Sequence, residues 1–210
     1  AVDGREALFQ ALRTGLGSAG KKLDEVYMAR FVKDPRPERH VEDLLEALGQ
    51  DTEGAEEAVE AVREAYYARL LADELPLRKE MDKLLRAAGE AGMRCGALTA
   101  LPETQAGALM ERLGLAQHGM TVHAVDPEAA YARSEDWYAL ASMLSVPGIR
   151  CVAVATSGVA SRGALMAGLH VVAVPDRFTA FEDYSGADLV VDDFAHLRPA
   201  DVLERFSLSS

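Results

Sequence analysis

Short apolar runs alternate with helical segments from Met93 to the end of the chain, and this alternation constrains the fold more than any other feature. The runs typical of strands are 94–100, 121–126, 150–156, 170–175 and 187–193. Because they have no polar face, they predict a sheet covered by helices on both sides. Strands that alternate with helices form parallel sheets with right-handed crossovers, so the sequence predicts an α/β fold.

Residues from about 5 to 91 have a different sequence pattern, because their apolar residues show only the three- and four-residue spacing of helices. A segment with two prolines, 31–40, separates the first two of these helices. Within it, Lys33, Arg36 and Arg39 bring positive charge to one loop of an acidic chain. Two interpretations stay open: the loop contacts an anionic substrate or partner, or it is a solvated turn.

The charge of the chain excludes some classes of function. Lys and Arg number 22 against 34 Asp and Glu, a net charge of −12, which argues against binding to nucleic acid or to an anionic membrane. We see no leader peptide and no apolar run long enough to cross a bilayer, so we expect a cytoplasmic protein. Cys95 and Cys151 fit no zinc-binding spacing and are predicted to be reduced core thiols.

Ligands of parallel α/β sheets bind at the carboxyl ends of the strands. In this sequence those ends are Thr99, 124–126, 155–157 and the pair Pro175 and Asp176. These positions are therefore the first candidates for a functional site.

Four stretches of the chain carry a family resemblance: VDGREALFQAL (2–12), RCGALTALPETQAGALMERLGL (94–115), RCVAVATSGVASRGALMAGLHVVAVPD (150–176) and ADLVVDDFAHL (187–197). The first resembles the segment that follows the first motif of the haloacid dehalogenase (HAD) superfamily, in its β-phosphoglucomutase and phosphatase branch. The others resemble the second motif, the fourth motif and the closing strand of the same family. The resemblance covers nearly the whole chain.

The resemblance implies a HAD-like, Rossmann-like parallel sheet with an all-helical cap inserted after the first strand. It implies three parts: 1–15 as the start of the core and hinge, 16–84 as the cap domain and 85–210 as the α/β core. It also implies that the first core strand is missing from the sequence. That strand would lie between 94–100 and 150–156.

The missing strand has an energetic consequence. Without it, the two flanking strands would stand about 10 Å apart, and each unpaired buried backbone group would cost about 1–3 kcal/mol. We therefore expect the strand to be supplied from upstream or from another chain, or the flanking strands to close up and pair directly.

Family members use a nucleophilic Asp, a second Asp as acid and base, a Lys that steadies the phosphate charge, and acids that hold Mg²⁺. In one alignment residues 1–4 follow the first motif, and in the other Asp3 matches the second Asp, while Ala1 stands at the nucleophile position. Neither alignment supplies the nucleophile. At the position of the Lys the chain has Tyr131, and the nearest cation is Arg133.

The fourth motif departs from the family as well. Ala155 and Thr156 stand where the metal-binding acids belong, and no carboxylate occurs between Ile149 and Pro175. Only Ser157 matches there, as Thr99 does in the second motif. We therefore predict no metal site and no cofactor, with Mg²⁺ used only if the chain is an enzyme after all.

These losses lead to three hypotheses. The leading one is a degenerate, catalytically inactive HAD-like protein, a pseudoenzyme that acts as a binding, scaffolding or regulatory subunit for a protein partner or a small anion. The alternative is a HAD-type phosphatase or phosphomutase acting on a small phosphorylated metabolite, with its nucleophile strand outside the sequence and Arg133 in the role of the Lys. The third is a metal-independent enzyme of altered chemistry in the same cleft.

Thr99, Arg133, Thr156 and Ser157 form the candidate anion-binding cleft in each case. Each of the four residues can instead have a purely structural role. The hydroxyl of Thr99 can satisfy backbone groups before a helix, and Thr156 or Ser157 can cap the next helix. Arg133 can be a surface arginine.

Overall fold

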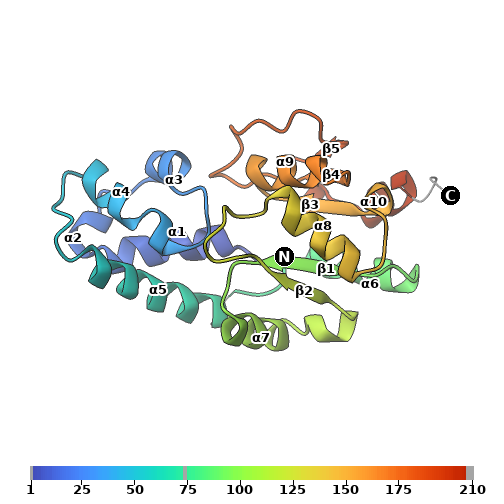
Figure 1. The fold of residues 1–210 in the computed structure, drawn as a ribbon, viewed down its shortest axis with the longest axis horizontal. Helices are drawn as coiled ribbons and strands as arrows, with labels where there is room; N and C mark the ends of the chain where they lie inside the picture. Colours follow the sequence, from blue (N-terminus) through green and yellow to red (C-terminus); the bar gives the residue numbers. More distant parts are fainter. Residues whose placement is uncertain (1, 73–74, 207–210) are drawn as a thin grey trace.

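The computed structural model describes residues 2–72 and 75–206. Figure 1 shows two parts, a block of helices built from the first third of the chain and an α/β part built from the rest. The predicted α/β class and the helical cap are confirmed.

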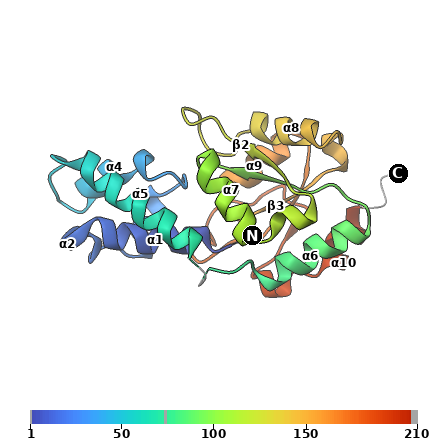
Figure 2. The same cartoon turned by 90° about the horizontal axis from the view of Figure 1, so that it is seen from below.

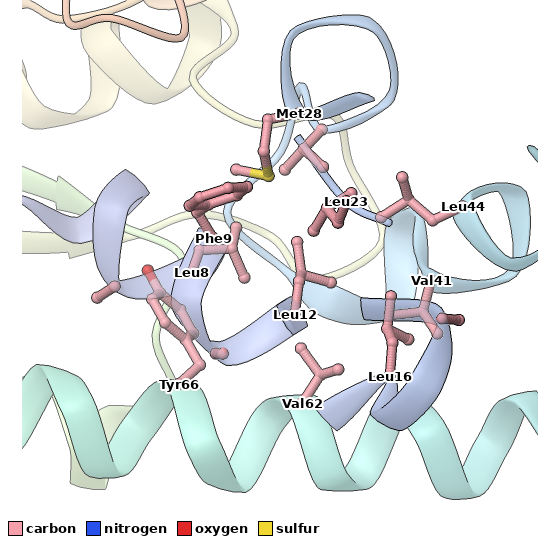
Figure 3. Close-up of a cluster of buried hydrophobic side chains, with 14 of the residues drawn as sticks. Leu8, Phe9, Leu12, Leu16, Leu23, Met28, Val41, Leu44, Val62 and Tyr66 are labelled. Atoms are coloured by element: carbon pink, nitrogen blue, oxygen red, sulfur yellow. The ribbon is translucent and has the colours of Figure 1, made fainter. Parts of the chain in front are cut away.

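The cap packs five helices around one apolar cluster. Its elements are α1 (Gly4–Gly15), α2 (Gly17–Gly20), α3 (Glu25–Phe31), the 3-10 turn η1 (Pro37–Arg39), α4 (Val41–Ala47) and α5 (Ala55–Leu71). Leu8 and Leu12 of α1 and Val62 of α5 are at most 2% exposed, and Figure 3 shows them facing one another. The two helices approach closely at Gly15, where an added Cβ would lie 2.6 Å from Cγ2 of Val62. Glycine is therefore what allows this helix contact.

The α/β part alternates strands and helices as the sequence predicts. The strands are β1 (Gly96–Thr99), β2 (Thr121–Ala124), β3 (Val152–Ala155), β4 (His170–Ala173) and β5 (Leu189–Val190). The helices are α6 (Lys79–Glu90), α7 (Glu103–Arg112), α8 (Ser134–Met143), α9 (Gly158–Met166) and α10 (Pro199–Phe206), with 3-10 turns η2 (Leu115–His118), η3 (Gly148–Arg150) and η4 (Phe194–His196). Every strand pair is parallel.

Helices cover both faces of the strands. Ala153 and Ala155 of β3 pack in a cluster with α9, whereas Val152 and Val154 pack with α6 on the opposite face. Leu98 of β1 packs against the α9 cluster, and α6 and α10 lie against each other on the other side (Figure 2). The strands therefore form one layer between two layers of helices, which is why their runs carry no polar face.

The strand layer is split. In the part of the chain that the structure describes, β1 pairs with β2 in one sheet and β3, β4 and β5 form a second sheet, so β1 and β3 are not paired with each other. The idea that the two flanking strands close up and pair is therefore wrong. The facing edges lie where the resemblance puts the first core strand, and the missing strand itself stays a prediction.

The helices near the predicted domain boundaries have clear packing partners. α1, predicted as core and hinge, packs along α5 within the cap cluster. α6, which spans the boundary predicted at 84/85, packs with its Leu84 and Leu85 against the strands and α10. The division at 16–84 and 85–210 stays a prediction.

Neither cysteine forms a disulfide within residues 2–72 and 75–206, and both are half-buried. No helix in these ranges is long and apolar enough to span a membrane.

Candidate functional site

A cavity of about 250 Å³ lies where the cap meets the carboxyl end of β1. Thr99 and Leu101 line it from the core, and Tyr66 and Leu70 of α5 line it from the cap. The inner face of α7 and the loop 35–37 close its sides, and Tyr131 completes the wall. Hydroxyl groups and apolar side chains therefore meet in one space at the strand end where α/β sheets bind ligands.

Thr99 occupies its expected place at the end of β1. Its Oγ1 accepts a hydrogen bond from the backbone N–H of Leu101 at 3.1 Å. The hydroxyl keeps its own proton to donate to another group. Thr99 thus fills the structural role and still faces the cavity.

Ser157 and Thr156 precede α9. Oγ of Ser157 accepts from the backbone N–H of Ala160 at 3.3 Å and so caps the helix. The carbonyl oxygen of Thr156 accepts from the hydroxyl of Thr179 at 2.8 Å. Neither Ser157 nor Thr156 is among the described residues that line the cavity.

The start of α9 already holds a carboxylate of the chain itself. The backbone N–H of Gly158 donates to Oε2 of Glu182 at 2.7 Å, and Oε1 of the same side chain pairs with Nζ of Lys33 at 3.0 Å. A helix N-terminus attracts anions, and here that position is filled by Glu182. No sequence pattern indicates this contact, because Glu182 lies in a loop after the next strand.

The side chains of Arg133 and Tyr131 lie in different surroundings. The guanidinium of Arg133 lies 3.8 Å from Oδ1 of Asp136, and its side chain is 40% exposed. The side chain of Tyr131 is half-buried and lines the cavity, and desolvation raises the pKa of its phenol. Arg133 does not line the cavity within the described residues.

The positively charged loop of the cap is bound to the core. Arg36 is 5% exposed, and its Nη1 donates to the carbonyl oxygens of Asp126 at 3.0 Å and Pro127 at 2.7 Å. Its Nη2 donates to the carbonyl of Ala129 at 2.6 Å and pairs with Asp34 at 2.6 Å. Arg36 therefore fixes the loop that leads to Tyr131.

Asp176 is the nearest acid at the end of β4. Its Oδ2 accepts from Nε of Arg5 at 3.2 Å, and its Oδ1 accepts from the backbone N–H of Phe178 at 2.8 Å. Arg5 belongs to α1, so this ion pair is a further link between cap and core.

The described residues alone do not fit a Mg²⁺ ion. Residues 2–72 and 75–206 contain no cluster of three or more His, Cys, Asp or Glu side chains placed to share a metal. Ala155 ends β3 and Thr156 follows it, at the positions where the resemblance expects acids, and Asp176 forms an ion pair with Arg5. A hard cation needs several oxygen ligands, so part of such a site would have to come from groups other than these.

Comparison with known proteins identifies one curated relative. No family model matches the chain. The plasmid protein CbbY of Cupriavidus necator is 30% identical over 154 residues, which are 71% of this chain and 61% of the relative. The chain thus spans 61% of the length of that protein.

Three solved structures share the fold. β-Phosphoglucomutase from Clostridium difficile superposes with a TM-score of 0.74 at 17% identity, over 98% of this chain and 92% of that chain. CbbY from Rhodobacter sphaeroides, in complex with xylulose-1,5-bisphosphate, gives 0.70 at 20%, over 93% and 91%. A HAD family hydrolase from Deinococcus radiodurans, with bound phosphate and sodium, gives 0.71 at 18%, over 95% and 89%. At these identities the structures establish the fold alone.

The comparisons correct one expectation and leave another without support. The prediction that no cofactor is used is contradicted, because the similar proteins are phosphate-handling members of a family whose chemistry relies on Mg²⁺, and one of them is seen with phosphate and sodium. The prediction of an inactive subunit with a protein partner finds no support in them. The chain therefore has a HAD-like fold with a helical cap, and its sequence is similar to that of CbbY.

Proposed function

We propose that the protein is a HAD-type phosphoester hydrolase that acts on a small phosphorylated metabolite. The cavity between the cap and the carboxyl end of β1 carries this proposal, because it places the Thr99 hydroxyl in a space of about 250 Å³ at the strand end where such sheets bind ligands. The relationship to CbbY and the phosphate and bisphosphate bound by similar proteins support it. A small anionic ligand is therefore the proposed partner of the site.

The residues of this chain bind and enclose the substrate in the proposed reaction. Thr99 donates its hydroxyl proton to a phosphoryl oxygen while its Oγ1 remains fixed by the Leu101 N–H. Tyr66 and Leu70 of the cap line one side of the cavity and displace water from that side. Water exclusion strengthens every hydrogen bond to the phosphoryl group.

The attacking carboxylate belongs, in this proposal, to a strand outside residues 1–210 that pairs between β1 and β3. The unpaired facing edges of these two strands support that placement. The family's chemistry also calls for Mg²⁺, and the described residues do not provide its ligands on their own. Cation dependence is therefore a property to measure on the intact native protein.

The experiment is a phosphatase assay of the intact protein from its native source. p-Nitrophenyl phosphate and a panel of sugar phosphates are tested with Mg²⁺ and with EDTA, and the intact mass and N-terminal sequence are determined on the same sample. Turnover that requires Mg²⁺ supports the proposal. No turnover of any substrate by the intact protein under either condition would refute it.

Thr99→Val tests the named residue. Valine keeps the shape and removes the hydroxyl, so we expect kcat/KM to fall by about 10- to 100-fold, the worth of one hydrogen bond to a charged group. Thr104→Val is the matched control, because Thr104 is exposed on α7. Equal losses in both variants, or no loss in Thr99→Val, would contradict the role of Thr99.

A further inference from the structure

The cavity offers hydroxyl groups instead of a free cation. Arg36 reaches its wall, but that guanidinium is committed to Asp34 and to three carbonyl oxygens of the loop 126–129. The other polar side chains in the wall belong to Thr99, Tyr66, Tyr67 and Tyr131. An anion in this cavity would therefore meet mainly neutral donors.

The backbone explains why Tyr131 faces inward and Arg133 does not. Ala132, between them, has a φ of 56°, in the left-handed region that an alanine rarely adopts. This turns the chain between the two side chains, and Ala132 itself is 1% exposed. Gly163 of α9 permits the arrangement, since an added Cβ there would lie 2.0 Å from the carbonyl oxygen of Ala132.

Tyr66 reaches the same cavity from the cap. Its hydroxyl lies 3.7 Å from the place a Cβ on Gly4 would take, and Gly4 also lines the cavity. Within residues 2–72 and 75–206, neither the Tyr66 nor the Tyr131 hydroxyl makes a hydrogen bond to another protein group. Both phenols therefore have a donor to offer to a ligand.

We propose that Tyr131, together with Tyr66, binds the phosphoryl oxygens of the substrate as a neutral hydrogen-bond donor, at the position where the family resemblance expects a lysine. This inference rests on the proposed function and names residues that determine how its site selects an anion. Tyr131 supplies one directed hydrogen bond without charge, whereas a lysine supplies a full charge.

Burial keeps these donors in their protonated form. Desolvation raises the pKa of Tyr66 and of Tyr131, and the negative charge of Asp34 acts in the same direction on both, while Arg5 opposes it. A phenol with a raised pKa stays a donor throughout the physiological range, so the site binds an anion without a titrating group of its own.

The test measures binding of inorganic phosphate to the intact native protein by isothermal titration calorimetry, beside hydrolysis of p-nitrophenyl phosphate. Tyr131→Phe keeps the ring and removes the hydroxyl, so we expect phosphate affinity to fall by about 10- to 100-fold. Tyr138→Phe is the matched control, because Tyr138 lies on the next helix and is 68% exposed. Tyr66→Phe repeats the test from the cap side and covers the case in which Tyr131→Phe fails to fold.

The salt dependence of binding gives a readout that a structural role would not move. Neutral donors predict that phosphate affinity changes little between low and moderate ionic strength, whereas Tyr131→Lys should bind phosphate more tightly and with a marked dependence on salt.

The outcomes separate this inference from the proposed function. Phosphate binding that is lost in Tyr131→Phe, in a protein that does not hydrolyse esters, would uphold the inference and reject the hydrolase. Hydrolysis and phosphate binding left unchanged in both Tyr131→Phe and Tyr66→Phe would overturn the inference and leave the hydrolase. A wild-type protein that neither binds phosphate nor hydrolyses esters would overturn both.

Discussion

The burial of His40 predicts that the protein loses stability in acid. His40 directly precedes α4, it is 3% exposed, and neither ring nitrogen has a hydrogen-bond partner among the described residues. Burial lowers its pKa from 6.5 to about 4, while Asp34 and Asp43 oppose the shift and Arg5 adds to it. The folded state therefore holds a neutral imidazole at pH values where an unfolded chain would already be protonated.

The direction of the pH dependence follows from which state, folded or unfolded, binds the proton on His40. Between pH 6.5 and pH 4 the unfolded chain carries a proton on His40 that the folded chain does not, so the free energy of unfolding falls as the pH falls. With these two pKa values, the loss attributable to His40 between pH 7 and pH 5 is about 2 kcal/mol. Above pH 6.5 the residue contributes its full share and the dependence levels off.

Urea unfolding at pH 7, 6 and 5 measures this effect. Other groups titrate in the same range, so wild type is compared with His40→Leu, which removes the titrating ring and its unpartnered nitrogens. The free energy of unfolding of the wild type should fall by about 2 kcal/mol more than that of the variant. His196→Leu, at an exposed position, is the control and should follow the wild type. Parallel curves for wild type and His40→Leu would refute the reasoning.

Two further substitutions test the packing that positions the site. Gly15→Ala should destabilise the protein by about 1–3 kcal/mol in urea unfolding, because the methyl group has no room beside Val62, whereas Gly89→Ala in an open position on α6 should be neutral or stabilising by up to about 1 kcal/mol. Arg36→Leu should lower the free energy of unfolding by about 3–5 kcal/mol, because the largely buried carboxylate of Asp34 loses its partner charge. It should also speed proteolysis between cap and core. Arg63→Ala, which breaks two ion pairs at the surface, with Glu38 and Glu60, should change the free energy of unfolding by less than about 1 kcal/mol. A similarly small change for Arg36→Leu would contradict the role of Arg36 as the anchor of the cap.

The strands were accessible from the sequence because buried parallel strands leave a simple signal. The run 150–156 has no polar face, and the structure explains this by packing its alternate side chains against helices on both sides. The position of Thr99 followed for the same reason, since a strand end in such a sheet is a defined place.

The rest of the cavity left no comparable pattern. Tyr66 lies on a cap helix, and only the docking of the cap brings its hydroxyl near Gly4 and the end of β1. In the sequence, charge alone favours Arg133 over Tyr131 as the residue that contacts an anion, but the left-handed backbone at Ala132 places Tyr131 at the cavity instead. A non-glycine residue in that conformation depends on its tertiary surroundings, here the space left by Gly163, and local sequence does not reveal it.

The split between β1 and β3 links the stability of the fold to the chemistry of the site. Each of these strands is four residues long and leaves one edge unpaired within the described residues. A strand that fills the space has to be apolar on both faces, because the side chains of β3 pack against helices on both sides of the layer. Being parallel, it would end beside Thr99 and Ala155, where a carboxylate in the next residues reaches the cavity. The same segment would therefore complete the sheet and supply the nucleophile, so both stability and turnover should rise together when it is present. A measured gain in one without the other would separate the two roles.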